Sequence, residues 1–380
     1  MWKHTRVTDS MWILVVGLLH LQISACGGDS PKASPVADTK ASDSYADTAP
    51  QAEDLIQSFE EKSSDSVESD SEENSSDVTQ VPDIVARGFG LDYDQDGIDD
   101  LTDNCVFEQN PEQDDMDEDG KGDDCDDDID ADTVPNNADL WPKDASLPGT
   151  GSSALIYAHT AAALYTLNPT TMETTLIGDF IWPDDISAAN PLMADIALDE
   201  YGVLYAISFD DLFVCHPVEL SCIRLGTTPK RFNGLTMIPK EIMNSDGDIL
   251  IATTPDGGWH QLTFANDEVS SEKLGNYGET YTSNGDAFSI QGFGTFVTAR
   301  SEGADYDIVA KVNPLNGSIL DSVVDLFGFQ SIKGLAGWNS QIFVFDGSGA
   351  ILQVKLSDST VKVASDTGPE WRGAGVRTSN

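Results

Sequence analysis

Two runs of alternating aspartates, each followed by a glycine, lie close together in the first half of the chain. The first run consists of Asp92, Asp94, Asp96, Gly97, Asp100 and Asp103. This spacing puts carboxylates at positions one, three, five, nine and twelve of a loop, with glycine at the sharp turn of position six and a backbone carbonyl available at position seven. Carboxylate and carbonyl oxygens at these positions predict a loop that wraps a hard divalent cation, and calcium fits best.

The second run repeats the pattern at Asp115, Asp117, Asp119, Gly120, Asp123 and Asp126. A third run keeps the spacing with Asp128, Asp130, Asp132, Asn136 and Asp139, but it has Thr133 in place of the glycine. The turn geometry and affinity of this third loop are therefore open at this point. The predicted metal ligands are Asp92, Asp94, Asp96, Ile98, Asp100 and Asp103, then Asp115, Asp117, Asp119, Lys121, Asp123 and Asp126, then Asp128, Asp130, Asp132 and Asp139, with Ile98 and Lys121 at the carbonyl position.

The order of residues across 92–139 resembles the thrombospondin type 3 repeat. The motifs that carry the resemblance are D-x-D-x-D-G-x-x-D-x-x-D-N-C and N-x-x-Q-x-D-x-D-x-D-G-x-G-D-x-C-D, which begin at Asp92 and Asn110. The resemblance implies several calcium ions bound along a ladder of aspartates, with a disulfide between Cys105 and Cys125 joining neighbouring repeats. The alternative is a solvated, disordered acidic run, as most charge blocks are.

Charge is distributed unevenly along the 380 residues, whose formal net charge is −46. Residues 92–132 hold 20 acidic side chains against one basic side chain, Lys121, whereas residues 149–380 hold 28 against 12. Such a chain lacks the Lys and Arg that phosphate contacts need, so we expect no nucleic-acid partner. Divalent cations are the natural counter-charge of the acidic segment.

The N-terminus has the pattern of an export signal. Lys3 and Arg6 precede a short apolar run from Met11 to Gln22. The run ends in Ile-Ser-Ala-Cys, which resembles the bacterial lipobox and implies cleavage after residue 25 and lipidation of Cys26. We therefore expect an exported bacterial lipoprotein at the outer membrane or cell surface, held to the membrane by its lipid. A plain signal peptide is the alternative. Residues 26–90, rich in Ser, Asp, Glu, Ala, Thr and Pro, predict a disordered acidic tether.

A strand pattern recurs through the C-terminal part at intervals of 48, 46, 46 and 47 residues. The repeated strands are centred on Ile156, Leu204, Leu250, Phe296 and Phe343, and each is followed by further strands and turns. The first repeat lacks the small-residue strand that precedes the others, and an extra one, RGAGV at 372–376, stands at the end of the chain. This predicts an all-β fold, a five-bladed β-propeller over 150–380 closed by joining both chain ends in one blade. The propeller would follow the irregular calcium-stabilised segment, 91–145, and the disordered linker. A two-sheet β-sandwich is the alternative.

Cys215 and Cys222 flank a hairpin-length connection. Residues opposed across antiparallel strands have the Cα spacing of a disulfide, so we expect a bond between them. A metal site is the alternative, with only His216 nearby.

No catalytic motif is present. His159, His216 and His260 fall in three different blades. Asp195 and Asp286, with Asp184 and Asp185 in an adjoining loop, are weak candidates for a glycosidase pair and are more typical of turn or surface acids. Three tryptophans that could form an aromatic platform, or pack between blades, are Trp259, Trp338 and Trp371.

The sequence therefore favours a non-enzymatic surface protein without deciding the question. We expect calcium to stiffen a spacer that presents the propeller as a binding module for an extracellular protein or glycan. A glycan-active hydrolase and a purely structural envelope protein are the alternatives.

Overall fold

A computed structural model describes residues 90–184, 186 and 192–379. The predicted signal peptide, Cys26, the tether and Asp185 lie outside these residues. In the described part the strands are β1 (Ile156–His159), β2 (Ala163–Leu167), β3 (Thr174–Asp179), β4 (Asp195–Leu198), β5 (Leu204–Ile207), β6 (Asp211–Cys215), β7 (Cys222–Thr227), β8 (Gly234–Ile238), β9 (Ile249–Thr253), β10 (Gly258–Ala265), β11 (Glu268–Asn276), β12 (Tyr281–Ile290), β13 (Gly294–Ser301), β14 (Asp307–Val312), β15 (Ile319–Leu326), β16 (Ile332–Trp338), β17 (Gln341–Asp346), β18 (Ile351–Lys355), β19 (Thr360–Ser365) and β20 (Gly373–Gly375). One short helix, α1 (Lys240–Met243), follows β8. No helix of the described residues is long and apolar enough to cross a membrane.

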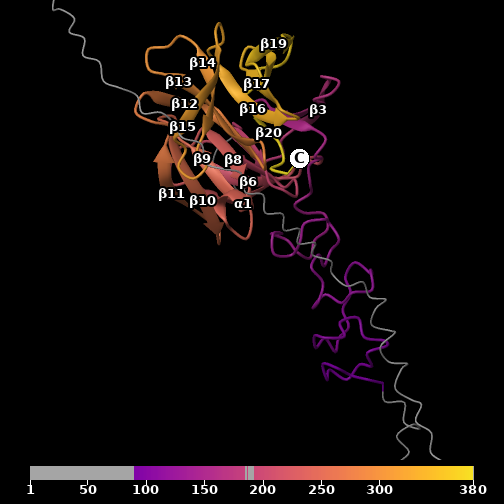
Figure 1. Ribbon diagram of the computed structural model, residues 1–380. Helices are drawn as coiled ribbons and strands as arrows, with labels where there is room; N and C mark the ends of the chain where they lie inside the picture. Colours follow the sequence, from indigo (N-terminus) through magenta and orange to yellow (C-terminus); the bar gives the residue numbers. More distant parts are fainter. Residues whose placement is uncertain (1–89, 185, 187–191, 380) are drawn as a thin grey trace, which may run out of the picture. The chain divides into compact units, whose positions relative to one another are not determined.

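The strands form five antiparallel groups of four, which we call blades one to five. Their strand orders are β20-β1-β2-β3, β4-β5-β6-β7, β8-β9-β10-β11, β12-β13-β14-β15 and β16-β17-β18-β19. Blades two and three also touch at their outer strands, where Thr227 of β7 pairs with Glu268 of β11. Figure 1 shows the blades gathered around a common centre in chain order. The predicted all-β class is confirmed.

The inner strands close into a ring. Each of β4, β8, β12, β16 and β20 contacts the next, and β20 contacts β4. This is the arrangement of a five-bladed propeller, and we call residues 150–379 the ring. As the sequence predicted, the C-terminal RGAGV supplies the inner strand of blade one, with Ala374 opposite Ala158. Two facing sheets of a sandwich are not what these residues form.

Small residues line the inner strands because the strands approach closely around the ring's centre. A Cβ on Gly234 would lie 2.8 Å from the carbonyl oxygen of Gly285, and a Cβ on Gly334 would lie 3.0 Å from the carbonyl carbon of Gly373. No side chain fits in such gaps without displacing backbone. The outer strands are the opposite case, since most residues of β3 and β19 are exposed.

Large apolar side chains fill the space between blades. Trp259 and Trp371 are fully buried, and Trp371 packs edge-to-face against Tyr165 and Phe345. Trp338 is partly buried against the same core. Trp259 and Trp371 therefore pack inside the ring and do not form an aromatic platform at the surface.

Both predicted cysteine pairs are disulfides. Cys105 is bonded to Cys125, with their Cα atoms 5.7 Å apart. Cys215 and Cys222 face each other across β6 and β7 and are bonded, with a Cα separation of 4.0 Å. The second bond excludes the metal alternative for that pair.

Residues 90–148 contain neither helix nor strand, and we call them the Asp-rich segment. The end of this segment packs on the ring. Val134 is fully buried in one apolar cluster with residues of blades two and three, and Ala138 and Trp141 pack against the same cluster.

Candidate metal centres in the Asp-rich segment

Three consecutive loops, 92–103, 115–126 and 128–139, share one hydrogen-bond pattern. In each, the carboxylate at position one accepts a bond from the backbone N–H at position six. The O···N distances are 3.2 Å for Asp92 and Gly97, 3.1 Å for Asp115 and Gly120, and 3.1 Å for Asp128 and Thr133. The third loop thus makes the same turn as the other two although it lacks the glycine.

The other ligand positions also repeat from loop to loop. Position three accepts from the N–H of position five in the pairs Asp94–Asp96, Asp117–Asp119 and Asp130–Asp132. Position five accepts from position seven in the pairs Asp96–Ile98, Asp119–Lys121 and Asp132–Val134, at 2.7 to 2.8 Å. Position nine accepts from position two in the pairs Asp100–Tyr93, Asp123–Met116 and Asn136–Ile129. Position twelve accepts from the residue two further on in the pairs Asp103–Cys105, Asp126–Asp128 and Asp139–Trp141.

Backbone dihedrals show that the third loop is strained at position six. Position six has φ of 99° at Gly97, 97° at Gly120 and 81° at Thr133. This left-handed region suits glycine and is unfavourable for a β-branched residue. The strain at Thr133 is therefore held in place by the surrounding bonds.

One oxygen of many loop carboxylates is bound to backbone, while the other is buried with no partner. These orphaned oxygens are Asp94 Oδ2, Asp103 Oδ2, Asp115 Oδ1, Asp128 Oδ1, Asp130 Oδ2, Asp132 Oδ2 and Asp139 Oδ2. The aspartates at positions one, three and five of each loop place their ligand atoms within 4.8 Å of one another. A buried anionic oxygen without a hydrogen bond is costly, and several together repel. A divalent cation removes both penalties.

The third loop shows this repulsion most clearly. Burial, opposed by the N–H of Val134 and reinforced by the charges of Asp139 and Asp130, raises the pKa of Asp132 to about 6. Burial also raises the pKa of Asp139. The third loop has four of the orphaned oxygens, so its donor set fits an ion at least as well as those of the first two loops.

The two lysines of the Asp-rich segment pair with acids of the second loop and with Asp127. The Lys143 ammonium lies 3.0 Å from Asp123 Oδ2 and, through this bond, lowers the pKa of Asp123. Lys121 lies 3.5 Å from Asp126 and 3.7 Å from Asp127. Two cations leave most of the segment's charge to other counter-ions, and the donor set of seven orphaned oxygens suits calcium or another hard divalent ion.

Polar side chains and the disulfide fasten loop one to loop two. Gln113 donates to Asp103 at 2.8 Å and accepts from the N–H of Asn104, and Asn110 donates to Asn104 at 2.6 Å. The N–H of Asn110 also donates to Asp96. These bonds explain why Asn and Gln recur in the motif between the aspartates.

The contact of the third loop with the ring was not predicted from the sequence. Val134 occupies the carbonyl position of the loop, and its side chain is part of the ring's core. Only its apolar character among aspartates could have signalled this. An ion held by Asp128, Asp130, Asp132 and Asp139 would therefore be one residue from the core of blades two and three.

Asp195 and Asp286, which the sequence favoured as turn or surface acids, are instead buried in inner strands at the centre of the ring. Both are fully buried, and they lie close enough for the charge of Asp286 to raise the pKa of Asp195. Asp195 accepts from the N–H of Leu235 at 2.7 Å, and Asp286 accepts from those of Leu335 at 2.5 Å and Ala374 at 3.0 Å. The pair thus ties together inner strands of all five blades.

Burial raises the pKa of both carboxyls well above the usual value, and the neighbouring charge of Asp286 raises that of Asp195 further. Backbone N–H groups bonded to each carboxyl oppose the shift. Glycosidase carboxylates stand about 5 Å or more apart so that a sugar fits between them. Asp195 and Asp286 are fully buried, which leaves no room for a sugar, and Asp184 is exposed elsewhere.

The histidines offer no metal site. In the described residues the side-chain clusters that could hold a metal all belong to the Asp-rich segment. His159 is fully buried, its Nε2 lies 3.7 Å from Asp195, and burial lowers its pKa to about 4. His260 packs on Phe232, and His216 accepts backbone bonds from Val218 and Glu219.

Comparisons with known proteins agree with this geometry. The thrombospondin type 3 repeat family matches residues 90–113 and 114–146, which contain all three loops, so the resemblance seen in the sequence is confirmed for this segment. No curated protein matches the chain. Among solved structures, a protein of unknown function from Bacteroides caccae is similar at a TM-score of 0.33 and 13% identity, over 56% of this chain and 72% of that one.

Proposed function

We propose that this protein is a lipid-anchored, exported calcium-binding protein in which a calcium-stiffened spacer presents the ring as a binding module. The observation that carries the proposal is the recurrence, in three successive loops, of carboxylates with one oxygen bonded to backbone and the other buried and free. A calcium-binding repeat is the family to which this segment corresponds.

The ligands of calcium would be the carboxylates at positions one, three, five and twelve and the carbonyls of Ile98, Lys121 and Val134. Calcium supplies positive charge where the carboxylates repel, and the protein residues hold their oxygens in place through the backbone bonds. Extracellular calcium modules bind at about 10⁻⁴–10⁻³ M, and we expect this range here.

The spacer role rests on the third loop. Because Val134 and Trp141 pack on blades two and three, ordering this loop fixes the Asp-rich segment to the ring. Without the ion, repulsion among Asp132, Asp139 and their neighbours works against the same contact. Calcium would therefore decide whether the connection is stiff.

The experiment is calorimetric titration of the full mature chain with calcium, with magnesium as the control ion. We expect binding at three sites near millimolar calcium, weaker for magnesium because its smaller shell demands near-ideal octahedral geometry. No heat and no spectroscopic change at several millimolar calcium would refute the proposal.

The membrane anchor is tested separately. Metabolic labelling with palmitate should mark the wild-type chain and not the Cys26→Ala variant. Label that persists in Cys26→Ala would contradict the anchor and leave the calcium sites untouched. If Cys26 carries the lipid, the acidic tether of residues 26–90 separates the lipid from the spacer.

A further inference from the structure

Residues in or just before all five inner strands line one cavity of the ring. The cavity lies next to the site where Asp195 accepts a bond from the N–H of Leu235 and Asp286 accepts bonds from those of Leu335 and Ala374. The residues two places earlier are Met193, Asn233, Asn284, Lys333 and Arg372. All five line one cavity of about 130 Å³, together with Ala194 and Phe209.

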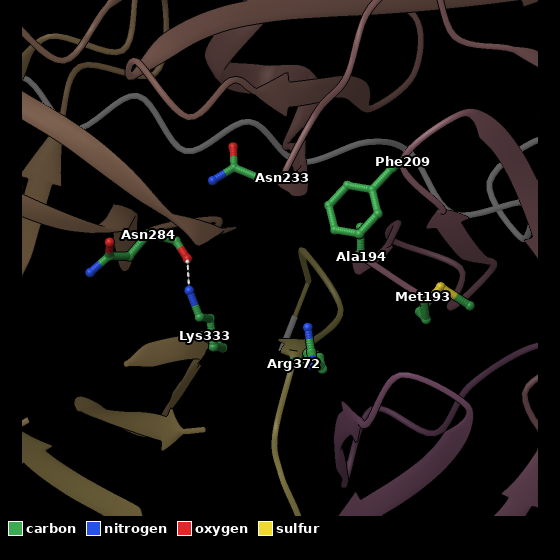
Figure 2. A pocket seen from close by; sticks show the side chains of 7 residues that line it. All are labelled: Met193, Ala194, Phe209, Asn233, Asn284, Lys333 and Arg372. Carbon is green, nitrogen blue, oxygen red and sulfur yellow. Dashed lines mark hydrogen bonds between the residues drawn. The ribbon is translucent and has the colours of Figure 1, made fainter. Parts of the chain in front are cut away.

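One wall of this cavity carries hydrogen-bond donors, two of which lack partners. Arg372 Nε and Asn284 Nδ2 are both buried without a hydrogen bond. Lys333 Nζ donates only to the backbone oxygen of Asn284, at 3.3 Å. Figure 2 shows Lys333, in β16, and Arg372, the residue before β20, at the same cavity.

The opposite wall is apolar. Met193 and Ala194 are buried, and the ring of Phe209 closes this side, with the Arg231 guanidinium 4.5 Å from its centroid. A ligand that satisfies both walls has an anionic end and an apolar body.

The charged side chains at this cavity are positive, whereas the chain as a whole is strongly negative. No acidic side chain is among the lining residues, although acids outnumber bases 28 to 12 over residues 149–380. Two cations, Lys333 and Arg372, face the cavity, while Glu370 pairs with the outer end of Arg372 at 2.7 Å.

Burial lowers the pKa of Lys333, because desolvation penalises its ammonium form. An anion beside the ammonium would offset that penalty. Glu370, which already neutralises part of the charge of Arg372, favours a singly charged anion over phosphate or sulfate, which carry up to two charges.

We propose that this cavity binds the carboxylate of a small monocarboxylic acid, with Lys333, Arg372 and Asn284 holding the carboxylate and Met193 and Phe209 contacting the carbon skeleton. The inference deepens the proposed function by naming the ligand chemistry of the ring, and it rests on the ring being a binding module. The volume of the cavity is below that of pockets for drug-sized ligands, about 300–1,000 Å³, so only a small acid or the tip of a larger one fits.

The test uses the full mature chain in saturating calcium and ligand-observed NMR titration with acetate, butyrate and benzoate, and with sulfate, phosphate and glucuronate. Butyrate or benzoate should bind more tightly than acetate, and sulfate and phosphate more weakly. Glucuronate distinguishes the source: tighter binding than butyrate would contradict the free acid and assign the carboxylate to a glycan.

Variants locate the site. Lys333→Met should weaken butyrate binding at least about tenfold, as expected for loss of a charge-assisted bond. Lys362→Met, on the exposed outer strand β19, is the matched control and should leave it unchanged. If Lys333→Met fails to fold, Asn284→Asp, which adds a negative charge with little change in shape, should abolish binding.

Equal binding by wild type, Lys333→Met and Asn284→Asp, or no binding of any monocarboxylate at tens of millimolar, would overturn the proposal. So would sulfate binding as tightly as butyrate. Calcium titration of the same variants should match wild type, so failure at this cavity and failure of the calcium sites are told apart.

Discussion

The backbone N–H of Thr133 donates to Asp128 Oδ2 at 3.1 Å, the bond that glycine makes in the two preceding loops. A threonine is held at φ 81° by this bond and by the burial of Val134 beside it. The third loop is thus formed by its setting against the ring, where the first two are formed by glycine.

Replacing Thr133 with glycine should relieve this strain. A non-glycine residue in the left-handed region costs about 1–2 kcal/mol, so Thr133→Gly should tighten calcium binding at the third loop by about fivefold, read by calorimetry. The matched control is Gly120→Ala, where a Cβ meets no atom within 4 Å and only the backbone resists. It should weaken the second loop by a similar factor. Calcium affinities that stay unchanged in both variants would show that φ at position six does not limit affinity.

Calcium should stabilise the ring through the third loop. Asp130→Asn and Asp117→Asn remove the same carboxylate, at position three, from the third and second loops. In a thermal melt followed by near-ultraviolet circular dichroism, adding calcium should raise the ring's midpoint in wild type and in Asp117→Asn, and by clearly less in Asp130→Asn. Equal calcium shifts in the two variants would argue against coupling through Val134.

The Asp195–Asp286 pair should be structural. Asp286→Ala leaves the buried N–H groups of Leu335 and Ala374 without an acceptor, which we expect to cost at least about 3 kcal/mol of unfolding free energy. Asp286→Asn keeps an oxygen for these groups and a donor for Asp195, so it should cost much less. Urea unfolding measures both, and equal losses would contradict the hydrogen-bond role.

Asp199 should make the ring less stable as pH rises. Burial, opposed by N–H groups of Val203 and Gly202 and reinforced by Asp248, raises its folded pKa to about 7. Its unfolded value is about 3.9. Below about pH 4 the Asp199 carboxyl is protonated in both the folded and the unfolded state, so it costs no folding stability. As the pH rises, the free-energy cost of ionising it in the folded state grows, and it is complete above about pH 7.

Asp199→Asn removes this penalty while its oxygen still accepts the bonds of Tyr201, Gly202 and Val203. Relative to wild type in saturating calcium, the variant should be equally stable near pH 4 and more stable by a few kcal/mol at pH 8. A stability difference that does not change with pH would contradict the raised pKa.

Much of the ring follows from local patterns. Strand and turn chemistry repeats at a regular interval, and the unpaired RGAGV predicts the strand pairing of β20 with β1. The aspartate spacing likewise places the loop carboxylates, because each loop's hydrogen bonds stay within or just beyond its twelve residues.

Contacts made only on closure could not be predicted. Asp195 and Asp286 were only weak candidates for a pair, because sequence does not show that they are buried and bonded to other blades. The gathering of Lys333 and Arg372 around one cavity depends on the same closure. The insertion of Val134 into the core joins two segments whose patterns differ, so neither pattern signals it.

Hydrogen–deuterium exchange on the full mature chain, with calcium and with a chelator, tests the central claim most directly. The account predicts that millimolar calcium slows exchange of the loop amides of Gly97, Gly120 and Thr133, each of which donates to its loop's first aspartate, and slows exchange at Val134 where the segment meets the ring. Exchange across residues 91–145 that is the same with calcium and with chelator would contradict a calcium-stiffened spacer.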